Sequence, residues 1–434
     1  MIHRPPALAL LGLFALLVPA EAASSGSEAK LCRDLQVEAP LRIEACSRAL
    51  GAPDLTQMQQ LDLLAARAQA FDDLGDHARA IADYDSAIVL APRDPVLRLN
   101  RGVAKIHGGR PGDAIADYDE AARLKPDWHL PYFDRAVALT DLGQRAAALK
   151  DYERAIQLKP DDAWIYVGQG DVLAASGDPA RALAAYDKAL ALRPGLDDPR
   201  AKRAEVLLRL DRPDEALPEL DRVLTLNPSK PRLWQTRGKA RFELADYVDA
   251  AADFGHALAL APDDKEVRRD LTRAELGAGD AEGAWRTLSS TLGSDGGEAA
   301  DLTLAAMVAL LTDRASAAEG LVRRAVDIQP GGATAQMVLA LHLLHQGDPD
   351  AAREAAALAV SFAPDDAEIA AVAKLAGAEI DPAETPAAPP LPRITPAQTA
   401  VADCVEALAA GDLAAARAAP AGWSLCHLAA ALAQ

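Results

Sequence analysis

Residues 61–94 read LDLLAARAQAFDDLGDHARAIADYDSAIVLAPRD. Alanines with scattered leucines dominate this stretch, a composition that favours closely packed helices over a sheet. The stretch closes at a proline, which cannot continue a helix and therefore separates it from the next one. The closing proline returns every 34 residues, and the series is Pro92, Pro126, Pro160, Pro194, Pro228, Pro262, Pro330 and Pro364. The one skipped place is Gly296, itself a helix terminator.

Small residues repeat with the same period. With Leu61 as position 1, the chain divides into nine blocks, from 61–94 to 333–366. Position 20 is always alanine, position 8 is glycine or alanine except at Thr272, and position 24 is tyrosine in the first four blocks. Small residues at fixed places let two helices approach closely, and the large residue at position 24 fills the space beside them. Most blocks also have a central glycine turn, at Gly75, Gly109, Gly143, Gly177, Gly279 or Gly347.

Period, small residues and turns together resemble the tetratricopeptide repeat (TPR). The resemblance covers residues 61–366. It implies an all-α fold, in which nine antiparallel helix pairs stack into a right-handed superhelical solenoid with a concave groove.

Four cysteines lie near the two ends of the chain, and four cysteines allow three pairings. Because the ends of a long helical stack lie far apart, we expect the local pairs Cys32–Cys46 and Cys404–Cys426, each holding one helical end together. The first pair predicts an N-terminal cap over 28–58, with helices at 28–36 and 40–50. After the repeats we expect a capping helix over 367–380, a proline-rich linker over 381–396 and a small helical hairpin over 397–434. The hairpin is either a free tail or folds back onto the array.

Residues 1–22 have the features of a secretory signal peptide: a weakly basic start, an apolar stretch from Ala7 to Val18, and the small-x-small sequence Ala20-Glu21-Ala22. We therefore expect an exported protein, periplasmic or secreted. No later segment is apolar for long enough to span a bilayer. The net charge of −19 argues against nucleic acid as a partner and against adhesion to anionic membrane surfaces.

We find no glycine loop for phosphate, no G-x-S-x-G and no H-E-x-x-H, and so expect no enzymatic activity, cofactor or metal. The pair His342 and His345 lacks a third ligand, so we interpret both as solvated or packed histidines. Recurring aspartates such as Asp83, Asp85, Asp117 and Asp119 are interpreted as surface features of the second helices.

In the TPR family the first helix of each repeat lines the groove through positions 2, 5, 6, 9, 12 and 13. On this sequence, repeats 2 to 4 then present an apolar strip with two aromatic residues, which we expect to contact a partner. Its candidates are Leu99, Asn100, Val103, Phe133, Asp134, Val137, Trp164, Val167 and Asp171. The aliphatic members are equally compatible with packing between helices. Phe133 and Trp164 are the stronger candidates.

Repeats 5 to 7 differ, because basic residues alternate with acidic ones at the same positions. The basic candidates are Lys202, Arg209, Arg232, Lys239, Arg269 and Arg273. They form either a zone that attracts an acidic segment of a partner or a solvated, ion-paired face.

These features predict a protein–protein interaction scaffold that binds a protein or peptide of unknown identity in the groove, in the cell envelope. Two alternatives stay open. The chain is a non-catalytic accessory subunit of an envelope enzyme or assembly complex, or it is a structural protein that self-associates through its C-terminal hairpin.

Overall fold

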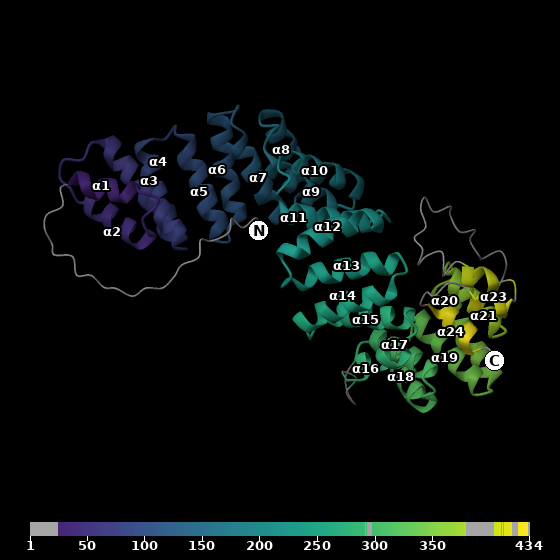
Figure 1. Cartoon of the computed structure of the whole chain (residues 1–434). Coiled ribbons are helices and arrows are strands. Elements are labelled where there is room, and N and C mark those ends of the chain that lie inside the picture. The colour runs from purple at the N-terminus through teal and green to yellow at the C-terminus, as the bar shows by residue number, and fades with distance from the viewer. Residues whose placement is uncertain are drawn as a thin grey trace. The chain divides into compact units, whose positions relative to one another are not determined.

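The computed structural model describes residues 25–290, 292, 297–378, 403–408, 410, 412–418 and 424–432, and all regular elements in these ranges are helices (Figure 1). The chain divides into two compact units, the first ending at Gly168 and the second beginning at Gln169. Within the described ranges, every helix is too short or too polar to cross a membrane. The expected signal segment 1–22 and linker 381–396 lie outside the described residues.

Helix pairs follow the 34-residue period, so the predicted all-α repeat fold is confirmed. The first helices of the nine pairs are α3 (Gln57–Asp73), α5 (Pro95–His107), α7 (His129–Asp141), α9 (Ala163–Ala175), α11 (Asp197–Leu208), α13 (Pro231–Glu243), α15 (Lys265–Gly277), α17 (Ala299–Leu311) and α19 (Ala333–His345). The second helices are α4 (His77–Leu90), α6 (Pro111–Leu124), α8 (Arg145–Leu158), α10 (Pro179–Leu192), α12 (Pro213–Leu226), α14 (Tyr247–Leu260), α16 (Ala281–Ser289), α18 (Ala315–Ile328) and α20 (Pro349–Phe362). Helix α21 (Ala367–Leu375) follows the ninth pair.

Close packing inside a pair depends on the small residue at position 8. A Cβ atom added to Gly102 would lie 2.5 Å from the ring of Tyr118, and one added to Gly238 would lie 2.7 Å from the ring of Phe254. Both rings occupy position 24 and are 1% exposed. Carbon atoms do not approach each other so closely. In these two repeats the aromatic ring at position 24 therefore requires glycine at position 8.

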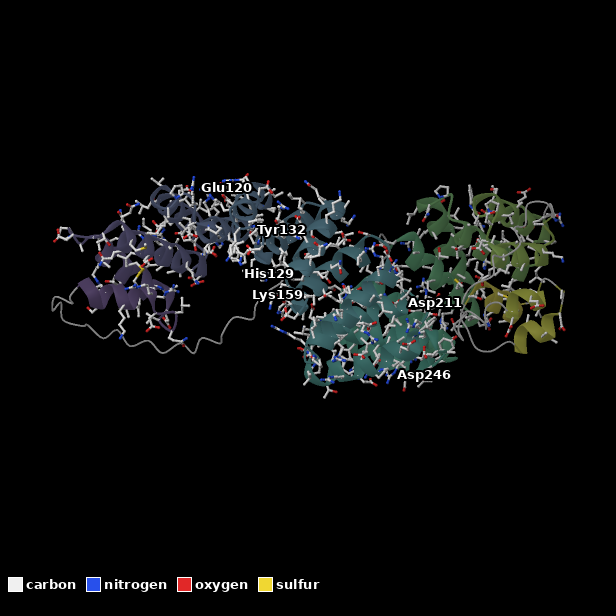
Figure 2. All side chains as sticks on the ribbon, turned by 90° about the horizontal axis from the view of Figure 1, so that it is seen from above. Glu120, His129, Tyr132, Lys159, Asp211 and Asp246 are labelled. Carbon is white, nitrogen blue, oxygen red and sulfur yellow. A yellow bond between two sulfur atoms is a disulfide. The ribbon has the colours of Figure 1, made fainter. Side chains whose placement is uncertain are left out.

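The turn inside each pair uses left-handed backbone at position 15 in all nine repeats. Six repeats have glycine there, with φ between 72° and 85°. The other three have Asp211, Ala245 and Asp313, with φ of 54°, 61° and 58° (Asp211 is labelled in Figure 2). A residue with a side chain loses roughly 1 kcal/mol in this conformation. In these three repeats the left-handed turn is therefore the same as in the other six, but its backbone conformation is locally strained.

A side-chain hydrogen bond closes the proline turns between repeats, which sequence analysis did not anticipate. The residue at position 4 donates to the carbonyl oxygen of the proline six residues before it. Examples are Tyr132 Oη to Pro126 at 3.4 Å and Trp234 Nε1 to Pro228 at 2.8 Å. Figure 2 labels Tyr132. The full set of donors is Arg98, Tyr132, Tyr166, Arg200, Trp234, Arg268 and Gln336. These side chains share only a donor at the end of a long stem, so no single residue type marks the position.

Arginines at position 7 connect the second helices of neighbouring repeats. Arg237 donates to both carboxylate oxygens of Asp253 at 2.9 and 2.7 Å, and its third nitrogen contacts Asp221 of the preceding repeat at 2.7 Å. Equivalent arginines are Arg67, Arg101, Arg135 and Arg203. A bidentate guanidinium can satisfy a carboxylate that is largely removed from water.

This arrangement corrects part of the interpretation of the recurring aspartates. Asp83 and Asp117 are buried, at 7% and 2% exposure, because each accepts the bidentate bonds of the arginine in its own repeat. Asp85 and Asp119 lie two residues later, and their side chains are 56% exposed, as expected for a surface position.

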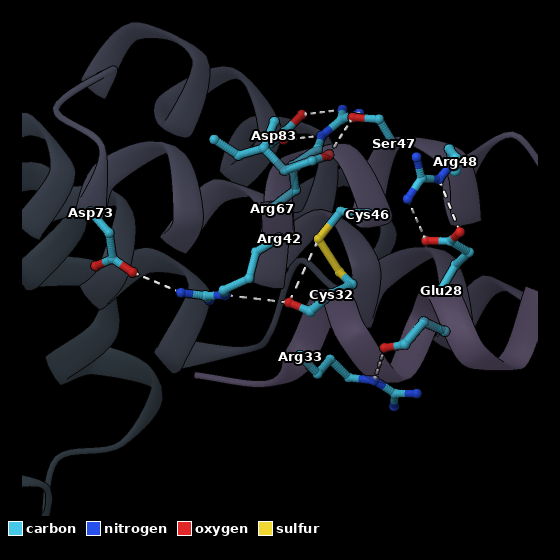
Figure 3. The surroundings of a disulfide bond; sticks show 12 residues. Glu28, Cys32, Arg33, Arg42, Cys46, Ser47, Arg48, Arg67, Asp73 and Asp83 are labelled. Atoms are coloured by element: carbon cyan, nitrogen blue, oxygen red, sulfur yellow. Dashed lines mark hydrogen bonds and ion pairs between the residues drawn. A yellow bond between two sulfur atoms is a disulfide. The ribbon is translucent and has the colours of Figure 1, made fainter. Parts of the chain in front are cut away.

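The N-terminal cap consists of α1 (Ser25–Arg33) and α2 (Ala39–Leu50), joined by the Cys32–Cys46 disulfide (Figure 3). Arg42 attaches this pair to the first repeat. Its side chain is 3% exposed, with Nη1 lying 2.9 Å from Asp73 Oδ2 on α3, while Nε donates to the Cys32 carbonyl oxygen at 3.4 Å. The cap therefore packs against the first repeat. Its first helix runs from Ser25 to Arg33, three residues earlier than the expected 28–36.

The C-terminal hairpin folds back onto the array. It contains helical residues 403–408, α23 (Leu413–Ala418) and α24 (Leu425–Leu432), and the second disulfide joins Cys404 to Cys426. Helix α24 lies against α17, α19 and α21. The Cys426 N–H donates to Glu368 Oε1 at 2.7 Å. This settles the question that the sequence left open.

Candidate functional site

The first helices form the inner layer of each stack. Helices α3, α5 and α7 contact one another in sequence in the first unit, as do α11, α13, α15, α17 and α19 in the second. No two consecutive second helices make comparable contact within the described ranges. Since the layer whose helices lie closer together is the inside of a curved stack, the candidate positions face the inner side of each unit.

In the first unit, the predicted strip divides into interior and accessible residues. Leu99 and Val167 are buried, at 6% and 1% exposure, and so contribute to helix packing and not to a free surface. The half-buried candidates on the inner layer are Asn100, Val103, Phe133, Asp134, Val137 and Trp164. Val96, on the same face, is 47% exposed.

Phe133 is held in place by aromatic packing. Its ring meets that of Tyr152 edge to face, with centroids 6.1 Å apart. Tyr152 is itself 2% exposed, because it fills the space between helices at position 24 of its repeat. A fixed ring with one half-exposed side loses little conformational freedom on binding.

Asp134 is the one carboxylate of this strip in the first unit. Burial raises its pKa to about 7, and the nearby His107 only partly opposes that shift. No described cation forms an ion pair with Asp134. A protonated or ionised Asp134 can therefore donate to, or accept from, a polar group that a partner brings beside the apolar strip.

In the second unit, each basic candidate contacts an acidic side chain or, for Arg209, a carbonyl oxygen of the preceding repeat. Lys202 Nζ lies 2.9 Å from Asp171 Oδ2, and Asp171 also accepts from the Tyr186 hydroxyl. Arg232 makes a bidentate pair with Glu205 at 2.7 and 2.9 Å. Arg209 donates to the Ala174 carbonyl oxygen, Lys239 contacts Glu266 and Asp270, Arg269 contacts Glu298 and Asp301, and Arg273 contacts Asp270. Of the two interpretations of these residues, the geometry favours the ion-paired face.

The inner face of repeats 8 and 9 is already occupied. Met307 and Leu310 of α17 are 6% exposed, and Met337 and Leu341 of α19 are 0% and 2% exposed. They share one apolar core with Leu425, Leu428 and Ala429 of α24. The chain thus binds a short apolar helix of its own on this face.

The histidine pair of repeat 9 does not form a ligand set. His342 is fully buried without a hydrogen-bond partner for either ring nitrogen, and burial lowers its pKa, so it is a neutral core residue. His345 is exposed. Sequence analysis missed a different group, Asp72, His77 and His107, whose potential ligand atoms lie within 4.8 Å of one another. Helix packing alone brings them together, so no local spacing motif could have revealed them.

Comparison with known families decides the nature of the repeats. Models described as "Tetratricopeptide repeat" match residues 173–240 and residues 65–127 and 303–367, and one described as "TPR repeat" matches residues 136–177. Together these matches span more than half of the chain. The chain belongs to the tetratricopeptide repeat family.

Several solved structures resemble parts of this TPR protein. MamA from Desulfovibrio magneticus RS-1 is 22% identical over 37% of this chain and 92% of its own, with a TM-score of 0.37. YrrB, described as a TPR protein with an unusual peptide-binding site, is 21% identical over 50% and 95%, with a TM-score of 0.33. The C-terminal part of a TPR protein from Cytophaga hutchinsonii is 18% identical over 57% and 99%, with a TM-score of 0.46. Among curated proteins, no significant match was found.

Proposed function

We propose that this TPR protein is an interaction scaffold that binds a segment of a partner protein on the inner face of α5, α7 and the start of α9. The partner segment presents apolar side chains to Phe133, Trp164 and Val137, and a polar group to Asp134. Burial of apolar area around the two aromatic residues supplies most of the affinity.

The observation that carries this proposal is the binding of α24 to the inner face of repeats 8 and 9. There the same positions of the repeat bury an apolar helix, with Leu425 and Leu428 reduced to 5% and 0% exposure. A charged side chain, Glu368, caps the contact by accepting the Cys426 N–H. The inner layer of this chain is therefore able to recognise a short apolar helix with one polar anchor.

The inner face of repeats 2 to 4 has the same ingredients. Phe133, Val137 and Trp164 are half-buried apolar residues, and Asp134 is a carboxylate without an ion-pair partner among the described residues. Within the first unit, no described segment covers these residues as α24 covers α19.

We further propose that the protein binds its partner in the cell envelope. The apolar start of the sequence and the two disulfides support export, because structural disulfides form in oxidising compartments. The N-terminal residue of the protein purified from its own cells tests this point. A chain that begins near Ala23 is expected, and a chain that retains residues 1–22 would contradict export with cleavage.

Site-specific photocrosslinking tests the binding surface. A photoreactive residue at Val137 is expected to trap one partner in intact cells. The same residue at Val89, which is 80% exposed on the second helix α4, is expected to trap none. Trp164→Ala should reduce the crosslink at Val137 at least tenfold without changing the helical circular dichroism signal.

Equal crosslinking at Val137 and Val89 would contradict the assignment of the inner face. Unchanged crosslinking in Trp164→Ala would remove Trp164 from the site.

A further inference from the structure

Asp72 occupies a position that is otherwise apolar or uncharged. It stands at position 12 of the first repeat, at the end of α3, and its side chain is 13% exposed. The other eight repeats have Ile106, Thr140, Ala174, Leu208, Phe242, Leu276, Leu310 and Leu344 at this position. A carboxylate that is largely removed from water requires compensating partners, and the repeat pattern by itself supplies none here.

Two histidines from neighbouring helices supply the contacts. His77 at the start of α4 places Nδ1 2.8 Å from Asp72 Oδ1, and His107 at the end of α5 places Nδ1 2.8 Å from Asp72 Oδ2. Among the described residues, no lysine or arginine pairs with Asp72, since Arg42 contacts the adjacent Asp73. Two imidazole nitrogens and one carboxylate therefore converge from three helices.

The donor set is one that binds divalent transition metals. Histidine nitrogen and aspartate oxygen are common zinc ligands, and three of them with one open position suffice for a four-coordinate ion. Three atoms within 4.8 Å of one another share a point at most about 2.8 Å from each, so shifts below about 1 Å reach zinc–ligand distances of about 2.0–2.2 Å.

We propose that Asp72, His77 and His107 form a binding site for one divalent first-row transition metal ion, with Zn²⁺ as the preferred occupant. In both histidines the nitrogen that faces the carboxylate is Nδ1, so the ion takes the place of a proton there, and each neutral metal-bound imidazole carries its proton on Nε2. The ion binds the end of α3, the start of α4 and the end of α5, and thereby fixes the first repeat against the second.

The surroundings leave the ion accessible. A shallow hollow borders His77 and is also lined by Asp76, Gly108 and Arg110, whose guanidinium pairs with Asp113. The His107 side chain is 52% exposed, so water can reach the ion and occupy its fourth position. A Cβ atom at Gly108 would lie 3.3 Å from the Cβ of His77, which shows how closely the end of α5 approaches the start of α4. Asp73 and Asp134 add negative potential at His107.

The untagged full-length protein, stripped with a chelator, is titrated with Zn²⁺ by calorimetry and with Co²⁺ by visible absorption. We expect one ion per chain and the intense absorption bands of four-coordinate Co²⁺. His107→Ala and Asp72→Asn should each weaken Zn²⁺ binding at least tenfold and abolish those bands. His256→Ala, which changes a histidine packed against Trp234 in the second unit, serves as the matched control and should bind normally.

Hydrogen exchange provides a second measurement on the same samples. Zn²⁺ should slow exchange at the turns that follow α3 and α5 in the unchanged protein and leave His107→Ala unaffected. Absence of saturable Zn²⁺ binding, or equal binding by the unchanged protein, His107→Ala and Asp72→Asn, would overturn the proposal and leave a hydrogen-bonded triad without an ion.

Discussion

Replacing Arg135 by methionine removes the cation that holds two carboxylates at the joint between repeats 2 and 3. Arg135 Nε and Nη2 lie 2.7 and 2.6 Å from the two oxygens of Asp151, and Nη1 contacts Asp119. The two carboxylates differ in environment: the side chain of Asp151 is 11% exposed and that of Asp119 is 56% exposed. The loss of Asp151's partner should therefore dominate the effect.

The magnitude follows from this difference. A buried carboxylate that loses its partner destabilises a protein by about 3 kcal/mol or more, while an exposed pair contributes at most about 1 kcal/mol. We expect Arg135→Met to lower the free energy of unfolding of repeat 3 by about 3 kcal/mol and Asp119→Asn to lower it by less than about 1 kcal/mol. The double variant Arg135→Met with Asp151→Leu should recover most of the loss, because no unpaired charge stays buried.

Hydrogen exchange read by mass spectrometry is the suitable assay, because a repeat array opens locally and not in one step. A loss of 3 kcal/mol corresponds to exchange on the order of a hundredfold faster in peptides from α7 and α8. Peptides from α19 and α20 provide the internal control and should not change. If Asp119→Asn were as harmful as Arg135→Met, or if the double variant stayed as unstable as the single one, charge pairing at Asp151 would not be the cause.

Two further predictions concern the left-handed turns and a buried carboxyl group. Ala245→Gly should raise the free energy of unfolding by about 0.5–1 kcal/mol, because position 245 has a φ of 61° and glycine adopts this conformation without strain. Gly143→Ala, at the equivalent turn with a φ of 72°, is expected to lower the free energy of unfolding. Melting temperatures that shift in the same direction in both variants would contradict this explanation. Burial raises the pKa of Glu275 to about 7. A hydrogen bond from Thr287 and the charge of Arg286 lower this pKa, while the charge of Asp280 raises it further. The Oε2 atom of Glu275 is buried without a hydrogen-bond partner. Because the folded chain binds this proton more tightly than the unfolded one, the contribution of Glu275 to stability is fully present below about pH 4.5 and is lost as the pH rises through about 7. Glu275→Gln should therefore melt higher than the unchanged protein at pH 8 and equally at pH 4, and a variant without this pH-dependent gain would show that the carboxylate is not strained.

Much of the candidate surface could be assigned to an inner face from the sequence, but its accessibility could not. The repeat period placed Leu99 and Phe133 at the same position, position 5, of repeats 2 and 3. The structure buries Leu99 and leaves Phe133 half-exposed, because burial depends on the neighbouring helices and not on the position in the repeat. Likewise the sequence showed that basic and acidic residues alternate in repeats 5 to 7, but not which of them pair, as Lys202 does with Asp171 and Lys239 with Glu266.

The amino-acid sequence by itself determined the fold class, the repeat boundaries and the pairing of the cysteines. Each of these is a local or periodic property: proline or glycine marks the turns at a fixed spacing, and in the first four repeats alanine or glycine at position 8 is followed 16 residues later by a tyrosine. Only the tertiary structure decided that α24 binds the inner face of repeats 8 and 9, that arginines bridge successive second helices, and that Asp72, His77 and His107 meet. These contacts join residues on different helices, and their geometry exists only after the helices have stacked.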